Sequence, residues 1–142
     1  MLLVLSKCTD VWLTKMNKLL FYIDFVSYRE TGMAITGLPY FALDYGPVPD
    51  RWARVYSEFD EIQQCPEAAP EYSGTLLKST TPPNLSVFSD KELQTIDKIC
   101  DSFGRLSASR ISELSHKEEA WLKNHQTHSA IDFKDAFLLR AI

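Results

Sequence analysis

The chain has 142 residues, a formal net charge of −4 and 45% hydrophobic residues, which indicates one globular domain with a substantial core. The negative charge disfavours a nucleic-acid partner, because phosphates require a basic surface. Cys8, Cys65 and Cys100 form no C-x-x-C pair and therefore indicate neither a zinc site nor a disulfide framework. No stretch approaches the roughly 18 apolar residues of a membrane span. We expect a soluble, cytoplasmic protein with no membrane partner.

Residues 14–29 predict a central helix that is apolar on most of its surface, which is typical of a helix buried in the middle of a domain. Gly32 is expected to end this helix, as glycine commonly does at a helix C-terminus. A short helix over residues 2–8 is predicted to precede it. The apolar positions of the central helix are Met16, Leu19, Leu20, Ile23 and Val26, with Phe21, Phe25 and Tyr28 beside them.

The middle of the chain predicts extended segments separated by turns. Alternating side chains over residues 38–45 predict a strand, and the two prolines of residues 46–49 are expected to stop it. An amphipathic helix is predicted over residues 50–63, because proline is well tolerated just before a helix. Residues 65–70 are expected to form a loop. Residues 72–78 predict a second strand, and residues 85–88 a short third one.

The last third of the chain predicts helices. Ser89 and Glu92 match a capping box that opens a helix ending near Gly104, and Ser107 is placed to cap a short helix after it. Ser115 and Glu118 match a second capping box, and a final helix is expected after residue 132. The predicted fold class is mainly α (α+β): a compact helical domain around the central helix, with a small two- or three-stranded β element over about 38–45, 72–78 and 85–88.

No catalytic motif is evident. The sequence contains no phosphate-binding glycine loop, no nucleophile elbow and no H-E-x-x-H pattern. His125 and His128 have a spacing that suits two metal ligands, but no spacing fixes a third. We therefore expect a non-enzymatic protein without a metal or cofactor. An enzyme built around Asp24 and His116 is the weakest alternative, since no nucleophile accompanies them.

Asp24 is the one carboxylate within the apolar central helix. A buried carboxylate must be hydrogen-bonded, paired or protonated, because desolvation disfavours its charge. We interpret Asp24 as a structural anchor that holds the central helix against the turn at residues 45–48, and the alternative is a polar point within a partner-binding cleft. His116 and Trp121 are interpreted as structural anchors as well.

A helix–turn–helix over residues 90–114 is the alternative functional interpretation, which would make the protein a DNA-binding transcriptional regulator. Arg105 and Arg110 are the basic residues available on its second half. Residues 90–123 contain six basic and seven acidic residues, so the segment is not basic. A plain helical hairpin is favoured, and nucleic acid is not the expected partner.

Several segments resemble the Panacea domain, also called the SocA-like antitoxin domain, in the same order along the chain. The similarity covers about residues 13–137, and the order of the segments makes it specific. The matching segments are Lys18–Asp24, Ile35–Gly37, Tyr45–Pro49, Phe88–Leu93, Leu114–Glu118 with Ala120 and Trp121, and Ile131–Phe133 with Ala136 and Phe137.

The resemblance implies a single Panacea domain over residues 1–142 that binds and neutralises a co-encoded bacterial or phage toxin of a type II toxin–antitoxin system. For the SocA member it also implies an adaptor that delivers its toxin to a protease. The toxin's identity does not carry over, because family members pair with unrelated toxins. The resemblance also implies that many family members carry a DNA-binding domain before this one; because this chain begins close to the Panacea domain, we do not expect that module or promoter binding here.

The partner is expected to bind around the rigid turn at residues 45–49. Residues 44–71 contain seven acidic and two basic residues, so their charge would attract a basic protein. Apolar and aromatic side chains would anchor the contact, and acids would form its rim. The candidate contact residues are Tyr40, Tyr45, Pro47, Val48 and Trp52, with Glu58 and Glu61 on the rim.

Overall fold

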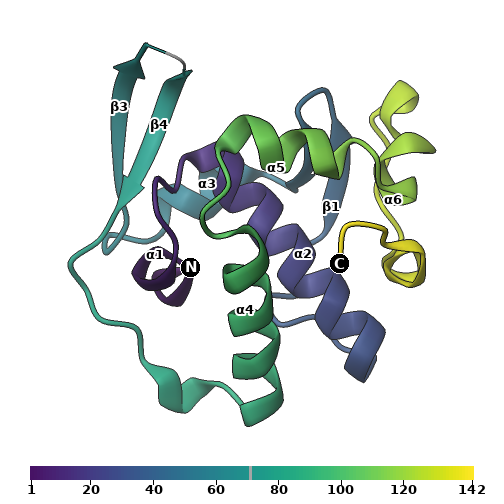
Figure 1. Cartoon of the computed structure of the whole chain (residues 1–142), viewed down its shortest axis with the longest axis horizontal. Coiled ribbons are helices and arrows are strands. Elements are labelled where there is room, and N and C mark those ends of the chain that lie inside the picture. Colours follow the sequence, from purple (N-terminus) through teal and green to yellow (C-terminus); the bar gives the residue numbers. More distant parts are fainter. Residues whose placement is uncertain (71) are drawn as a thin grey trace.

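The computed structural model describes residues 1–70 and 72–142 and is mainly helical, with two small β-hairpins (Figure 1). The helices are α1 (Leu2–Lys7), α2 (Leu13–Thr31), α3 (Trp52–Ser57), α4 (Asp90–Phe103), α5 (Ala108–Ser115) and α6 (Glu119–Leu122). The 3-10 helices are η1 (Leu85–Val87), η2 (His125–Thr127) and η3 (Phe133–Leu138). The strands are β1 (Tyr40–Leu43), β2 (Gly46–Pro49), β3 (Gln63–Ala69) and β4 (Tyr72–Lys78). They pair as two antiparallel sheets, β1–β2 and β3–β4.

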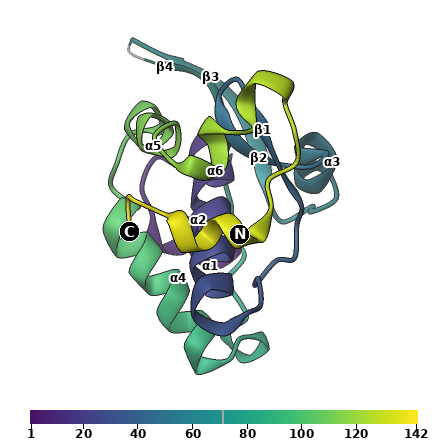
Figure 2. The same cartoon turned by 90° about the vertical axis from the view of Figure 1, so that its right-hand side faces the viewer.

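Helix α2 is the centre of the fold, as the apolar pattern predicts. It packs against α4, α5, β2 and η3, and residues 15–27 are all buried. The two cartoon views show α4 and α5 on one side of α2 and the β1–β2 hairpin with α3 on another (Figure 2). Gly32 ends the helix in a left-handed conformation with φ 78°, which confirms the predicted stop.

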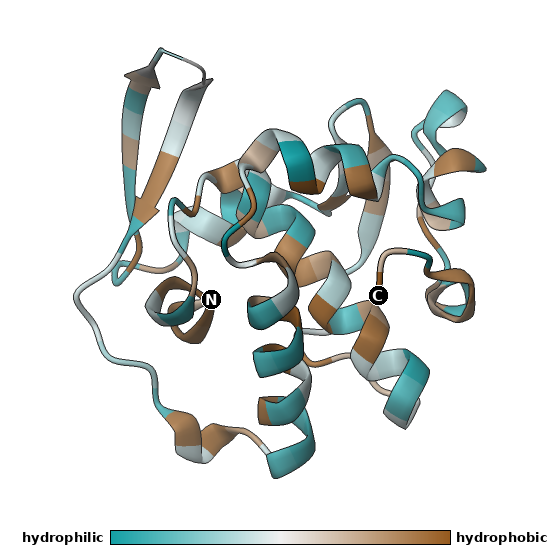
Figure 3. Cartoon of the chain, viewed as in Figure 1, coloured by the Kyte–Doolittle hydropathy of each residue, from teal (hydrophilic) through white to brown (hydrophobic). Residues whose placement is uncertain are grey.

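The hydropathy colouring follows this arrangement (Figure 3). Hydrophobic residues recur along α2, whereas α4 presents mostly hydrophilic residues to the viewer. Helix α4 buries one stripe, which contains Ile96, Ile99 and Phe103. The amphipathic helix thus covers the central one, and burial of its apolar stripe supplies the main driving force for the packing.

Residues 46–49 form strand β2, although their prolines were expected to prevent a strand. Pro47 lies opposite Ala42, and Pro49 lies opposite Tyr40. Those two β1 residues use their backbone groups on the other edge, where Ala42 N donates to Ser129 O (3.1 Å) and Tyr40 O accepts from Ile131 N (2.8 Å). The positions opposite them therefore need no N–H directed at β1, so proline is tolerated in β2.

Three further segments differ from the sequence-based expectations. The helix predicted over 50–63 is limited to α3, and three carboxylates just beyond it (Glu58, Asp60 and Glu61) disfavour extension at the negative end of the helix dipole. The expected loop at 65–70 belongs largely to β3, which pairs with β4 from Gln63–Lys78 to Ala69–Tyr72. The strand expected at 85–88 is wrong: Asn84 Oδ1 accepts from Ser86 N (3.1 Å) and starts η1 instead.

One of the two predicted capping boxes forms. Ser89 and Glu92 cap each other's backbone at the start of α4, as predicted. The box at Ser115 and Glu118 is wrong, because Ser115 lies within α5 and its hydroxyl donates to Ser112 O (2.8 Å). The final helix after residue 132 is the 3-10 helix η3, capped by the Asp132 side chain.

Among the helices of residues 1–70 and 72–142, none combines the length and apolarity that crossing a bilayer requires.

Candidate protein-binding groove

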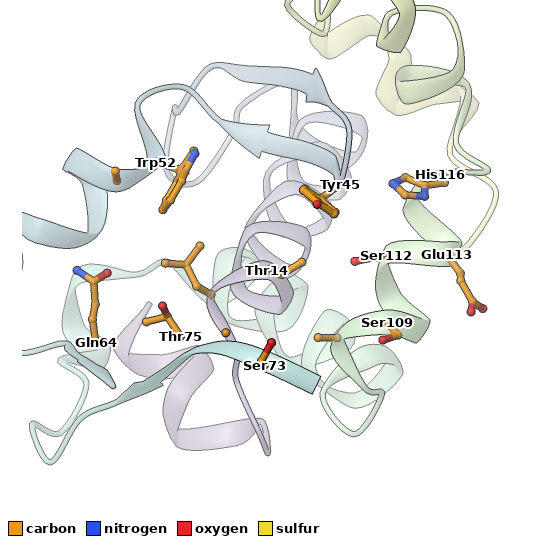
Figure 4. Close-up of a pocket in the computed structure, with 14 residues that line it drawn as sticks. Thr14, Tyr45, Trp52, Gln64, Ser73, Thr75, Ser109, Ser112, Glu113 and His116 are labelled. Atoms are coloured by element: carbon orange, nitrogen blue, oxygen red, sulfur yellow. The ribbon is translucent and has the colours of Figure 1, made fainter. Parts of the chain in front are cut away.

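An open groove of about 880 Å³ lies between the two hairpins and helix α5 (Figure 4). Its walls come from segments far apart in the sequence: the start of α2, the β1–β2 turn, α3, the β3–β4 hairpin and α5. The lining residues are Leu13, Thr14, Tyr45, Trp52, Ala53, Gln64, Ser73, Gly74, Thr75, Ala108, Ser109, Ser112, Glu113 and His116. We call this feature the groove.

Two aromatic residues stand at the edge of the groove. Tyr45 is 77% exposed at the tip of the β1–β2 turn, and Trp52 is 38% exposed at the start of α3. Figure 4 shows both side chains beside the cavity, with serine and threonine side chains along its walls. Exposed aromatic rings next to hydrogen-bonding groups are typical of surfaces that bind other proteins.

Of the other predicted contact residues, three are buried and two are exposed. Tyr40, Pro47 and Val48 are buried within the β1–β2 hairpin, so in this conformation they support the turn and cannot themselves touch a partner. Glu58 is exposed and pairs with Arg54 (Nε–Oε1 2.6 Å). Glu61 is exposed outside the groove lining, where it borders a separate hollow near α1.

Asp24 connects α2 to the segment before β1. Its Oδ1 accepts from Thr36 N (2.7 Å), and its Oδ2 accepts from Tyr40 OH (2.7 Å) and from the Thr36 hydroxyl. Burial raises the pKa of the Asp24 carboxyl, while these hydrogen bonds act in the opposite direction. The contact lies before the turn at residues 45–48, not on the turn as we expected.

His116 and Trp121 contact the β1–β2 turn directly. Trp121 Nε1 donates to Leu43 O (2.8 Å), and the backbone of Tyr45 lies beside the His116 ring, where it acts against the lowering of the ring's pKa by burial. The two rings stack with their centroids 4.3 Å apart. Burial lowers the pKa of His116, so the ring is neutral at physiological pH. These contacts hold Tyr45 at the edge of the groove in this conformation.

The polar residues that complete the groove were not predicted from the sequence. Ser73 and Thr75 come from β4, and Ser109 and Ser112 come from α5. Serines and threonines are common on any surface, and their convergence depends on how the hairpin and helix pack. Lys18 was not predicted as a site residue either. A charged residue within an apolar helix was the one feature of the sequence that pointed to it.

One of the two basic residues of the alternative helix–turn–helix interpretation is paired with an acidic residue. Arg110 Nη1 pairs with Glu113 Oε2 (2.8 Å), and α5 turns Ala108 and Ile111 into the protein. A pair of this kind neutralises one of the two arginines that would face phosphate.

Within the part of the chain that the structure describes, no three His, Cys, Asp or Glu side chains gather closely enough to hold a metal ion.

The comparisons with known proteins identify the family. Residues 16–122 match the model of the family described as antitoxin SocA-like, Panacea domain. No curated protein and no solved structure matches the chain significantly. The family match spans most of the chain, from α2 to α6. The chain therefore belongs to the antitoxin SocA-like family and carries its Panacea domain, which supports an antitoxin-type role.

Proposed function

We propose that this chain is a non-enzymatic antitoxin that neutralises a co-encoded protein toxin in the cytoplasm by binding it in the groove. The observation that carries the proposal is the open groove of about 880 Å³ with exposed Tyr45 and Trp52 at its edge, in a chain that belongs to an antitoxin-type family. The exposed aromatic side chains would supply apolar anchors.

The walls of the groove suit a segment of polypeptide. Hydroxyl groups of Ser73, Thr75 and Ser109 and the amide of Gln64 can donate to and accept from peptide groups. The acidic residues around α3, including Glu58 and Glu61, would favour encounter with a basic toxin. Such a surface binds through apolar anchors and hydrogen bonds and needs no catalytic group.

Co-expression with the product of the adjacent reading frame tests this function. We expect the wild-type chain to restore growth and to co-purify with that product. Trp52→Ala combined with Tyr45→Ala should weaken binding at least tenfold, because truncation of central aromatic anchors commonly costs about 2 kcal/mol or more. Val87→Ala is the matched control, since Val87 is 68% exposed in η1 and lies outside the groove lining.

Failure of the wild-type chain to rescue growth and to co-purify would refute the antitoxin function. Equal binding by the aromatic double variant and the Val87→Ala control would instead refute the groove as the binding surface.

The proposal includes delivery of the bound toxin to a protease, which the resemblance to SocA implies. A pulse-chase of the toxin tests it: the toxin should disappear faster when the antitoxin is present. An unchanged toxin half-life in cells that the antitoxin rescues would show neutralisation by binding alone.

A further inference from the structure

Four charged or amide side chains are buried along α2, and Lys18 differs from the other three. Lys15 Nζ donates to Thr9 O (2.6 Å) and Gly104 O (2.8 Å). Asn17 Oδ1 accepts from Tyr56 OH (2.7 Å), and Asp24 has the partners given above. Lys18 is 0% exposed, yet its Nζ has no hydrogen-bond partner among the described residues.

The Lys18 side chain lies beneath the β1–β2 turn and against α5. A Cβ added at Gly46 would lie 2.8 Å from Lys18 Cε and 2.7 Å from Ser115 Oγ, so both side chains reach the same point of the turn. A side chain at Gly46 would displace the ends of Lys18 and Ser115, and the φ of 103° is one that residues other than glycine rarely adopt. The Ser115 hydroxyl already donates to Ser112 O, and the structure shows no carboxylate bonded to the ammonium among the described residues.

Two further buried polar atoms without partners lie nearby, Ser112 Oγ and His116 Nε2. These residues are four apart on α5 and therefore share one face of the helix. Both line the groove, and Figure 4 shows both side chains directed towards Tyr45. Burial is the main cause of the lowered pKa of His116, and the positive charge of Lys18 contributes to it, so the two side chains interact electrostatically. We call Lys18, Ser112 and His116 the polar cluster.

The polar cluster lacks an anion. An ammonium without a partner is costly in a protein interior, and burial lowers the pKa of Lys18 to about 7. Glu113 is the acidic residue in the groove lining, but it is exposed and pairs with Arg110. A carboxylate accepts several hydrogen bonds, so one carboxylate could satisfy both the ammonium and the Ser112 hydroxyl.

We propose that the polar cluster is a carboxylate-binding subsite at one end of the groove, filled by an acidic side chain or the chain-terminal carboxylate of the bound toxin. The inference rests on the proposed function, because the carboxylate belongs to the protein in the groove. Entry requires the turn at Tyr45 and Gly46 to move aside. That turn is a two-residue connection between β1 and β2, and Tyr45 at its tip is largely exposed.

The first test compares the affinity of three variants for the product of the adjacent reading frame. Lys18→Met keeps the length of the side chain and removes its charge, and we expect it to weaken binding at least tenfold. Ser112→Ala should weaken binding severalfold. Lys134→Met removes an exposed lysine outside the groove lining and should change the affinity less than twofold.

The second test identifies the carboxylate by double-mutant cycles. Each Asp and Glu of the toxin is changed to Asn or Gln, and its C-terminus is amidated. One of these changes should weaken binding to the wild-type chain at least tenfold and have little further effect on Lys18→Met. Whether that change is a side-chain substitution or the amidation distinguishes the two sources of carboxylate. If Lys18→Met does not fold, Ser112→Ala is used in the same cycles.

Two results would overturn the subsite while leaving the proposed function intact. One is tight binding of the toxin by both Lys18→Met and Ser112→Ala. The other is a loss of affinity in these variants that no toxin carboxylate shares. A wild-type chain that does not bind the toxin would overturn the proposed function itself, and the subsite with it.

Discussion

At the residue scale, the buried polar side chains of α2 have different roles. Lys15 connects α2 to the end of α4 and to the loop before α2, and Asp24 connects it to Thr36 and Tyr40. Buried polar groups of this kind fix the position of the segments that they bond, because leaving either partner unsatisfied costs more than the bond itself contributes. Lys18 has no such bond among the described residues, so hydrogen bonding within the protein does not account for a lysine at this buried position.

Asp24→Ala should lower the free energy of unfolding by about 2 kcal/mol, because the buried hydroxyl of Tyr40 loses its acceptor. Urea unfolding at pH 7 measures the change. Asp101→Ala, which removes an exposed carboxylate from α4, serves as the control and should change stability by less than about 0.5 kcal/mol. Equal stabilities of the two variants would show that Asp24 is not an anchor.

Lys18→Met should be more stable than the wild type near pH 7, and the difference should shrink as the pH rises. The folded-state pKa of Lys18 is about 7, and its unfolded-state pKa is about 10.4, so between these values the unfolded state binds more protons. The wild type therefore gains stability from Lys18 as the pH rises, by up to about 1.4 kcal/mol per pH unit.

Urea unfolding of wild type and Lys18→Met at several values from pH 7 to 9 checks this sign. Taking the difference between the two proteins removes contributions common to both, such as those of the cysteines and tyrosines. His116 titrates below this range because its pKa is lowered. A difference that stays constant with pH would contradict the assignment of a buried, unpaired ammonium.

At the element scale, the start of α4 and the end of α2 were predictable from the sequence, whereas the start of α6, the end of α3 and the pairing of the strands were not. Ser89, Glu92 and Gly32 act through contacts within a few residues, so their patterns identify the ends of α4 and α2. Strand β2 depends instead on which edge of β1 it occupies, a tertiary property that lets two prolines stand in a strand. The same reason limits prediction of the groove. Tyr45 and Trp52 were predicted as contact residues from the sequence around the rigid turn, whereas Thr75 and Ser109 come together only through packing.

Ser89→Ala should destabilise the protein by about 1 kcal/mol. The Ser89 hydroxyl accepts from Glu92 N (3.3 Å), and Glu92 Oε2 accepts in return from Ser89 N (2.7 Å). Thermal or urea unfolding measures the loss. Ser102→Ala, at an exposed serine inside the same helix, provides the comparison and should be neutral or slightly stabilising. A loss of similar size at both serines would argue against the cap.

At the scale of the whole molecule, the ends of the chain are connected to the core. The buried carboxylate of Glu118 accepts from Tyr22 OH (3.1 Å), Arg140 N (2.8 Å) and Ala141 N (3.0 Å). Helix α1 contacts α4, and η3 contacts α2. Residues on both sides of the family match at 16–122 therefore pack on one core.

The groove stays open between the hairpins and α5. We propose that the toxin binds there. Amide hydrogen exchange with and without the co-expressed toxin tests the claim most directly. We expect slower exchange in three separate segments that line the groove, at residues 45–53, 73–75 and 108–116. Slower exchange confined to other surfaces, such as η1 or the exposed face of α4, would contradict it.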